Sequence, residues 1–126
     1  MKQLWFAAGL LAALLTVTLV SGRYIQSFSD GLTEALVQSQ DLARTGHWGQ
    51  AEQQTQNAYQ RWQDNHFYLH TVMQHSDTDQ ILRKFREVLE YLQIREWDQY
   101  TAANADLITQ IQLLAEMEQA SLVNVL

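Results

Sequence analysis

The sequence predicts an all-α protein: an N-terminal transmembrane helix (residues 1–23) followed by an antiparallel helical bundle of three to four helices (residues 24–126). The 126 residues include no proline and five glycines, so little in the interior forbids helix. Beyond the first twenty-odd residues, apolar side chains recur at intervals of three and four, the spacing of a helix with one buried face. The length suits one domain with one core.

The first segment is predicted to anchor the chain in a membrane. Leu4–Val20 is seventeen residues without a charge, and it lies between Lys2 and Arg23. A helix from Trp5 to Tyr24 rises ~29 Å, close to the ~30 Å hydrocarbon core of a bilayer. The two aromatic residues then lie near opposite interfaces, where such residues are enriched. We therefore expect an uncleaved single-pass span.

A cleaved signal peptide is the alternative for this segment. Val20 and Gly22 are small enough to precede a cut at Arg23, which would release a secreted helical domain. For an uncleaved span, the charges favour a cytoplasmic amino end, because Lys2 and the α-amino group precede the span and Arg23 alone directly follows it. We therefore expect a cell-membrane protein with its soluble body outside the cytoplasm.

The first helix is predicted to continue beyond the membrane to about Ala43. Its apolar positions recur at helical spacing: Tyr24, Ile25, Phe28, Leu32, Leu36 and Leu42. Gly31 costs about 1 kcal/mol relative to alanine inside a helix, so a bend near Asp30 and Gly31 is the alternative. The segment Arg44–Gly49 is the first helix stop, with Gly46 where a left-handed cap is needed.

Three further helices are predicted. The second runs from about Trp48 to Met73, with a core stripe of Ala51, Thr55, Ala58, Tyr59, Trp62, His66, Leu69 and Met73. His75–Asp79 is expected to form a turn in which Ser76 and Asp79 resemble a capping box. The third helix buries Ile81, Leu82, Phe85, Val88, Leu89 and Leu92, opposite Arg83, Lys84, Glu87 and Glu90. After a break at Gln93–Asp98, the fourth has an inner face of Trp97, Tyr100, Asn104, Leu107, Ile108, Ile111 and Leu114.

The chain also contains a faint internal repeat. Trp48 and Trp97, forty-nine positions apart, each open a helix and are followed by small residues one to two turns later. Two copies are fewer than the three or so that a solenoid needs. We interpret the repeat as two helical hairpins built on similar lines.

The histidines form a candidate metal site. His66 and His70 lie one turn apart on the predicted second helix, which is the i, i+4 geometry of two-histidine metal sites. A third ligand has to come from elsewhere, and the candidates are His47, Asp106 and Glu118. A structural role is the favoured interpretation, with His66 hydrogen-bonded beside Tyr59 and Trp62. A pH-sensing role is a further alternative, since a histidine pKa lies near ~6.5.

Two other polar residues lie on the inner face of the fourth helix. A buried polar group costs about 1–3 kcal/mol unless it is paired. Asn104 and Glu118 are therefore predicted to bond to His66, Tyr59 or a backbone group in a structural network.

Composition argues against several classes of function. With no cysteine, the chain has no thiolate nucleophile and no cysteine-based zinc site. The formal charge is −6, and the only basic cluster is Arg83, Lys84 and Arg86, so a nucleic-acid partner is not expected. There is no phosphate loop, nucleophile elbow or dinucleotide fingerprint, so we expect no enzyme, no cofactor and no small-molecule substrate.

The order of features is similar to that of a known family. "SGRY", "GHWGQA", "RWQDNHFYLHTVMQH", "FREVLEYLQIREWDQY" and "ANADLITQIQLLAEMEQ" follow a short apolar segment and precede a hydrophobic end. Over essentially its whole length the chain resembles the family of small membrane-anchored proteins called domain of unknown function 4363. The resemblance implies an anchored helical domain from a bacterium, and we expect that bacterium to be Gram-positive. It carries over no catalytic or binding residue.

The sequence thus favours a non-catalytic interaction or scaffolding module. We expect it to dock to another membrane or envelope protein, or to associate with itself. A metal- or proton-sensing domain that uses His66 and His70 is the alternative from a different class.

Overall fold

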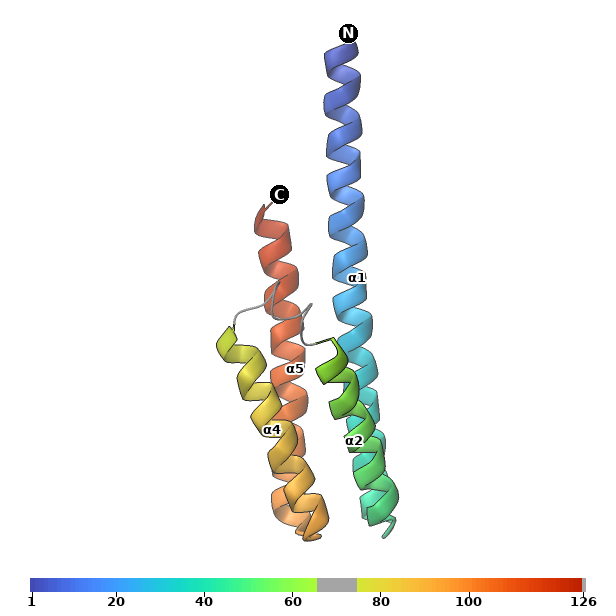
Figure 1. Cartoon of the computed structure of the whole chain (residues 1–126), viewed down its shortest axis with the longest axis vertical. Helices are drawn as coiled ribbons and strands as arrows, with labels where there is room; N and C mark the ends of the chain where they lie inside the picture. Colours follow the sequence, from blue (N-terminus) through green and yellow to red (C-terminus); the bar gives the residue numbers. More distant parts are fainter. Residues whose placement is uncertain (66–74, 126) are drawn as a thin grey trace.

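The computed structural model describes residues 1–65 and 75–125, apart from the side chains at positions 21, 22, 75–78, 118, 119 and 121–125. These residues form four helices: α1 (Lys2–Arg44), α2 (Trp48–Asp64), α4 (His75–Gln93) and α5 (Trp97–Val125) (Figure 1). The described part of the chain contains no strand, so the all-α prediction is confirmed.

The helices form a four-membered ring in which α1 contacts α2 and α5, and α4 contacts the same two helices. Neighbours run in opposite directions. Ser39 bonds to Thr55 and Gly31 to Arg61 across the α1–α2 contact, so residue numbers rise on α2 as they fall on α1. The amino-terminal end of α1 extends well beyond the other three helices, and α5 reaches further along α1 than α2 and α4 do (Figure 1).

The core is built from the predicted stripes. Its largest fully buried side chains include Trp62, Phe85 and Tyr100. The ring centroids of Tyr59 and Phe85 lie 5.5 Å apart, and those of Trp62 and Phe85 lie 6.4 Å apart. The predicted core positions in the described part are buried or half-buried, except Tyr24, which is exposed. Periodicity alone therefore identified the buried faces.

Two predicted boundaries between α2 and α4 were wrong. Helix α2 ends at Asp64, short of Met73, because Asn65 caps it with a side-chain amide that donates to the Arg61 carbonyl at 2.9 Å. Helix α4 begins at His75, so His75–Asp79 is helix and Ser76 lies inside it. The segment His75–Asp79 contains no glycine or proline, the residues that most often interrupt a helix. The predicted stripe positions His66, Leu69 and Met73 lie outside the described residues.

Helix α1 shows no break at Gly31. The residue lies against α2, where the Arg61 guanidinium donates to its carbonyl at 3.4 Å. A Cβ at position 31 would meet the Arg61 Nη1 at 3.7 Å, an ordinary contact. The first helix therefore continues beyond Ala43 to Arg44, as one 43-residue rod.

Both hairpins turn through the same cap. At the end of α1, Gly46 has a φ of 87° and donates to the Ala43 carbonyl at 3.0 Å, while the His47 N–H donates to the Leu42 carbonyl at 2.8 Å. This is a Schellman motif, with glycine at the left-handed position. At the end of α4 the corresponding bonds run from Arg95 to Leu92 at 3.2 Å and from Glu96 to Tyr91 at 3.1 Å. There the left-handed residue is Arg95, with a φ of 56°.

An offset of forty-nine positions relates the two hairpins throughout. Both members of each of the following pairs are buried: Leu32 and Ile81, Leu36 and Phe85, Ser39 and Val88, Ala43 and Leu92, Ala51 and Tyr100, Thr55 and Asn104, Ala58 and Leu107, Trp62 and Ile111. The two tryptophans that revealed the repeat meet edge to face, with ring centroids 6.2 Å apart. The bundle is thus a two-fold pseudo-symmetric pair of helical hairpins.

The two caps predict opposite effects of glycine. Gly46→Ala is expected to destabilise the fold by about 1–2 kcal/mol, because a Cβ is strained in the left-handed region. Arg95→Gly removes such strain from an exposed position and is expected to stabilise by about 0.5–1 kcal/mol. Urea denaturation of both variants checks the signs. Equal signs would contradict the assignment of both residues to the same cap position.

Candidate functional site

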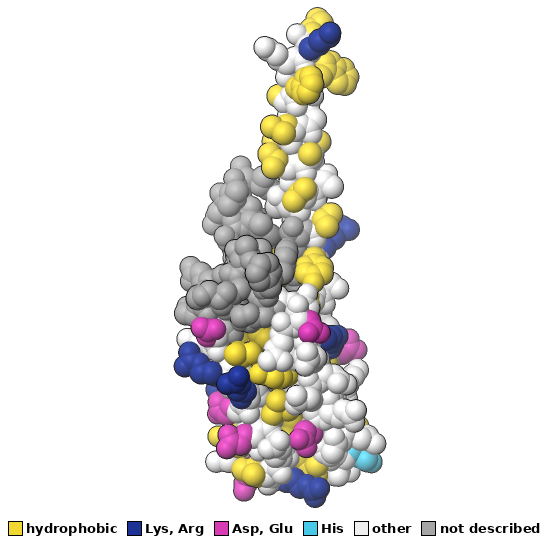
Figure 2. All heavy atoms as spheres, in the orientation of Figure 1, with side chains coloured by type: hydrophobic (Ala, Val, Ile, Leu, Met, Phe, Trp, Pro, Cys, Tyr) yellow, Lys and Arg dark blue, Asp and Glu magenta, His cyan; other side chains and the backbone are white. Residues whose placement is uncertain are grey.

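The apolar segment of α1, residues 4–20, is the most unusual surface of the molecule. Its large side chains are exposed, among them Trp5, Phe6 and Leu10. Figure 2 shows apolar side chains along the protruding rod, with charged ones at its tip and over the body. By length and composition α1 is a helix that could cross a membrane, and none of its most apolar stretch is buried.

The hydroxyl groups of this segment are satisfied within the helix. Thr16 donates its hydroxyl proton to the Ala12 carbonyl at 2.8 Å, and Thr18 donates to the Leu14 carbonyl at 2.9 Å. An unsatisfied donor in hydrocarbon costs several kcal/mol, and back-bonding to the preceding turn avoids that cost. Both threonine hydroxyls of the segment are therefore paired within α1.

The same helix changes environment within one and a half turns. Val20 is 62% exposed, whereas Ile25 is 2% exposed and belongs to the core. At the change, Tyr24 donates its hydroxyl proton to the Asn65 Oδ1 at 2.7 Å and stacks on Phe28, with centroids 6.3 Å apart. The end of α2 is thereby tied to α1 at the point where α1 leaves the body.

The histidine site cannot be assembled from the described residues. His66 and His70 lie outside them. His47 is exposed at the start of α2, where its Nδ1 bonds to the Thr45 hydroxyl at 2.9 Å, and Asp106 lies 3.7 Å from the Lys84 ammonium. The Glu118 side chain is not described. Within residues 1–65 and 75–125, no three described histidine or acidic side chains are grouped to hold a metal ion.

A buried hydroxyl network joins three helices. Ser39 of α1 donates to the Ala51 carbonyl at 2.7 Å. A hydroxyl has one proton, so Ser39 accepts from its two other partners: Thr55 of α2 at 2.6 Å and Tyr100 of α5 at 3.1 Å. All three side chains are fully buried. The network fixes the relative heights of α1, α2 and α5.

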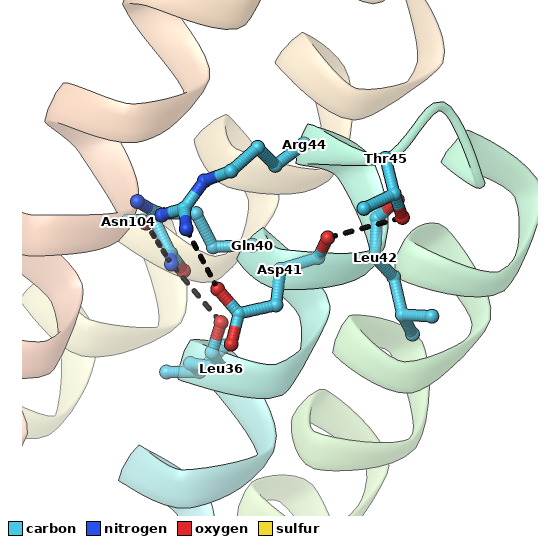
Figure 3. Close-up of polar contacts among 7 residues, drawn as sticks. All are labelled: Leu36, Gln40, Asp41, Leu42, Arg44, Thr45 and Asn104. Carbon is cyan, nitrogen blue, oxygen red and sulfur yellow. Dashed lines mark hydrogen bonds and ion pairs between the residues drawn. The ribbon is translucent and has the colours of Figure 1, made fainter.

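Asn104 makes a second buried polar contact one turn away (Figure 3). Its amide donates at 3.1 Å to the Leu36 carbonyl and at 3.1 Å to the Gln40 Oε1, both on α1. The prediction that Asn104 pairs with a backbone group is confirmed. Its own Oδ1 has no hydrogen-bond partner among the described residues.

These polar contacts distinguish the two hairpins. The positions equivalent to Ser39 and Tyr100 are Val88 and Ala51, so the α2–α4 contact lacks the corresponding hydroxyls. The Ser39–Tyr100 hydrogen bond therefore occurs at the α1–α5 contact and has no equivalent at the α2–α4 contact.

Sequence reasoning missed Ser39. Leu32, Leu36 and Ala43 mark the same face of α1, and the intervals of three and four between them place position 39 in line. A buried Thr55 on the facing stripe was the second available signal. Which residues bond to Ser39 depends on the register between α1 and α5, and periodicity within one helix does not predict that register.

Burial raises the pKa of Tyr100 above the ordinary tyrosine pKa of about 10, because the phenolate would lose its hydration. The Ser39 hydroxyl lowers this pKa, and the charge of Asp41, which pairs with Arg44 at 3.4 Å (Figure 3), raises it. The folded state thus holds the phenol proton more tightly than the unfolded chain. The resulting gain in the free energy of unfolding is at its full value below pH ~10. It is lost as the pH rises through the raised pKa of Tyr100.

Tyr100→Phe tests this pH dependence. At pH 8 the variant is expected to lose about 1 kcal/mol of unfolding free energy, because one buried hydrogen bond disappears. Above pH ~10 the wild type is expected to lose stability more steeply than the variant, since only the wild type has this proton to release. Urea denaturation from pH 8 to pH 11 measures both slopes. Parallel slopes would show that the pKa of Tyr100 is the same in the folded and unfolded states.

The described interior offers little room for a substrate. The cleft between α4 and α5, lined by Gln80, Ile81, Gln110, Leu113, Leu114 and Met117, measures about 140 Å³. Ligand pockets usually measure ~300–1,000 Å³.

Comparisons with known proteins give one match. No curated protein and no solved structure matches the chain. The model of the family described as "Domain of unknown function (DUF4363)" matches residues 19–125, which begin inside the apolar segment and include the whole bundle. The chain belongs to the DUF4363 family.

Proposed function

We propose that the chain is a single-pass membrane protein whose bundle is a non-catalytic scaffold for another membrane or envelope protein. One observation carries the proposal: the 43-residue α1 is apolar and exposed from Leu4 to Val20 and becomes a core helix at Ile25. A soluble protein rarely exposes so large an apolar surface. A bilayer covers that surface without any change in the bundle.

The geometry makes the bundle an extension of the span. From Tyr24 to Arg44, α1 rises about 30 Å beyond the membrane surface. It is held by α2 and α5 along this length, so the bundle axis follows the span axis. The Trp48–Trp97 contact lies at the distal end, about 30 Å from the bilayer. The scaffold thus presents its surface at a fixed height.

A protein partner fits the surface of the body. Its core is closed by aromatic and aliphatic side chains, while Val37 on α1 remains 47% exposed. The charges that flank the span favour a body outside the cytoplasm, because Lys2 and the α-amino group precede the span and Arg23 alone directly follows it. We therefore place the partner on the extracytoplasmic side.

Single-cysteine labelling tests the span and its orientation, because the chain has no cysteine of its own. Gln50→Cys lies at the exposed distal end, and Gln3→Cys lies before the apolar segment. A membrane-impermeant maleimide is expected to label Gln50→Cys in intact cells and Gln3→Cys only after permeabilisation. Labelling of both in intact cells contradicts the span, and the reverse pattern contradicts the orientation.

Photo-crosslinking in the same cells tests the scaffold. A benzophenone side chain at Val37 is expected to give a discrete adduct with a second protein, and the same group at Gln50 serves as the matched distal control. Recovery of the monomer alone from both sites would contradict the scaffold while leaving the membrane anchor intact.

A further inference from the structure

We infer that the last turns of α5 enter the same leaflet that α1 crosses, so that the bundle contacts the lipid through two helices. The inference rests on the proposed membrane span of α1. The occupant of the α5 end is the headgroup and outer acyl region of the bilayer.

The register between α1 and α5 sets the height of the α5 end. Ser39 bonds to Tyr100, and the Leu36 carbonyl bonds to Asn104, so paired residue numbers add to 139 or 140. Nearer the membrane, Ile25 lines the same small cavity as Leu114 and Ala115, at the same register. Because both helices rise about 1.5 Å per residue, the register holds along their length. Ala120 is then level with Val20, and Val125 with Leu15.

Figure 1 shows the same relation. Helix α5 rises past the start of α4 and ends level with the middle of the protruding part of α1. The body therefore does not stop at a flat plane below the apolar segment. A membrane placed around residues 4–20 of α1 necessarily meets the end of α5.

Along the bundle axis, the charged residues of the α1 and α5 body segments end at the same level. On α1 the charged residue that adjoins the apolar segment is Arg23. The register places Arg23 level with Met117, between Glu116 and Glu118. Beyond Glu118 the sequence of α5 is uncharged and includes Leu122, Val123 and Val125. Both helices thus become uncharged at a common level, as expected at a membrane surface.

Apolar side chains of α5 are exposed as the helix approaches that level. Leu113 is 51% exposed and Met117 is 54% exposed; they lie one turn apart and border the cleft between α4 and α5. Ala120 continues this exposed face. The uncharged residues from Gln119 to Val125 rise about 10 Å, a third of the ~30 Å hydrocarbon core. The α5 end therefore reaches the near leaflet without crossing it.

Depth-dependent fluorescence quenching tests the contact in the full chain. Single cysteines at Leu113, Met117 and Ala120 are labelled with a small environment-sensitive fluorophore and reconstituted in phosphatidylcholine–phosphatidylglycerol vesicles. Leu11→Cys is the control within the span, and Gln50→Cys is the distal control. Lipids with a nitroxide high on the acyl chain quench from the membrane, and iodide quenches from water.

The expected result is a gradient along α5. Lipid quenching at Ala120 is expected to exceed that at Gln50 at least three-fold, with Met117 intermediate and Leu113 close to Gln50, and iodide quenching runs in the opposite order. Circular dichroism of each labelled variant confirms that the helices are intact. Because three exposed sites are used, the gradient remains measurable if one variant misfolds.

Three outcomes would overturn the inference, and they differ in whether the proposed membrane span of α1 also fails. If Leu11 is quenched by lipid and Ala120 behaves like Gln50, the α5 contact fails and the span stands. If Ala120 is protected from both quenchers, a protein or a second copy covers the α5 end. If Leu11 also resists lipid quenching, the proposed span fails with the inference.

Discussion

Phe85→Ala is expected to destabilise the bundle by about 3–5 kcal/mol, the usual cost of removing a fully buried phenylalanine. Phe85 is 0% exposed and contacts Tyr59 and Trp62 of the other hairpin. The deletion therefore opens a cavity at the contact between α2 and α4. Domains of this size have total stabilities of about 5–15 kcal/mol, so the loss is a large fraction of the total.

Thermal denaturation followed by circular dichroism measures this loss. A fall in Tm of about 12–40 °C is expected, from roughly 4–8 °C per kcal/mol for a domain of this size. Val37→Ala is the matched control on α1, because its side chain is half exposed and its removal is expected to cost at most about 0.5 kcal/mol. Equal effects of the two substitutions would contradict the assignment of Phe85 to the core.

Deletion of residues 4–20 is expected to move the chain from the membrane pellet to the supernatant after alkaline extraction. Removal of about seventeen apolar residues eliminates the only described helix that could cross a bilayer. The helical signal of the remaining residues is expected to persist, because the deleted side chains lie outside the core.

The matched control restores the length with different residues. Replacing Leu4–Val20 with seventeen leucines is expected to return the chain to the pellet, since hydrophobic length and not side-chain identity is what a span requires. Retention of the deleted form in the pellet would show that another part of the chain, or a partner, holds it there.

The helices and their buried faces could be predicted because they depend on local spacing. Leu32, Leu36, Phe85 and Leu107 each lie on a stripe that intervals of three and four define, whatever the partner helix is. The left-handed cap at Gly46 was also local, because glycine favours that conformation. At the end of α4 the same φ region is occupied by Arg95, so the break there was evident only from the change in stripe phase.

The features that the sequence did not predict depend on contacts between helices. The end of α2 at Asp64 involves Asn65, whose side chain also accepts a bond from Tyr24 of α1. The Ser39 network requires α2 and α5 at a particular height, which no single-helix pattern contains. The metal hypothesis for His66 and His70 stays a prediction, because both residues lie outside the described part.

The most direct test of a helix shared by membrane and bundle is a distance across the bilayer surface. Spin labels at Leu11→Cys and Val37→Cys, both exposed positions of α1, are measured by pulsed electron resonance in lipid vesicles. A continuous α-helix predicts one narrow peak near ~39 Å, from a rise of 1.5 Å for each intervening residue. A broad distribution, or a peak near the ~28 Å expected for a right-angle bend at Gly22, would contradict it.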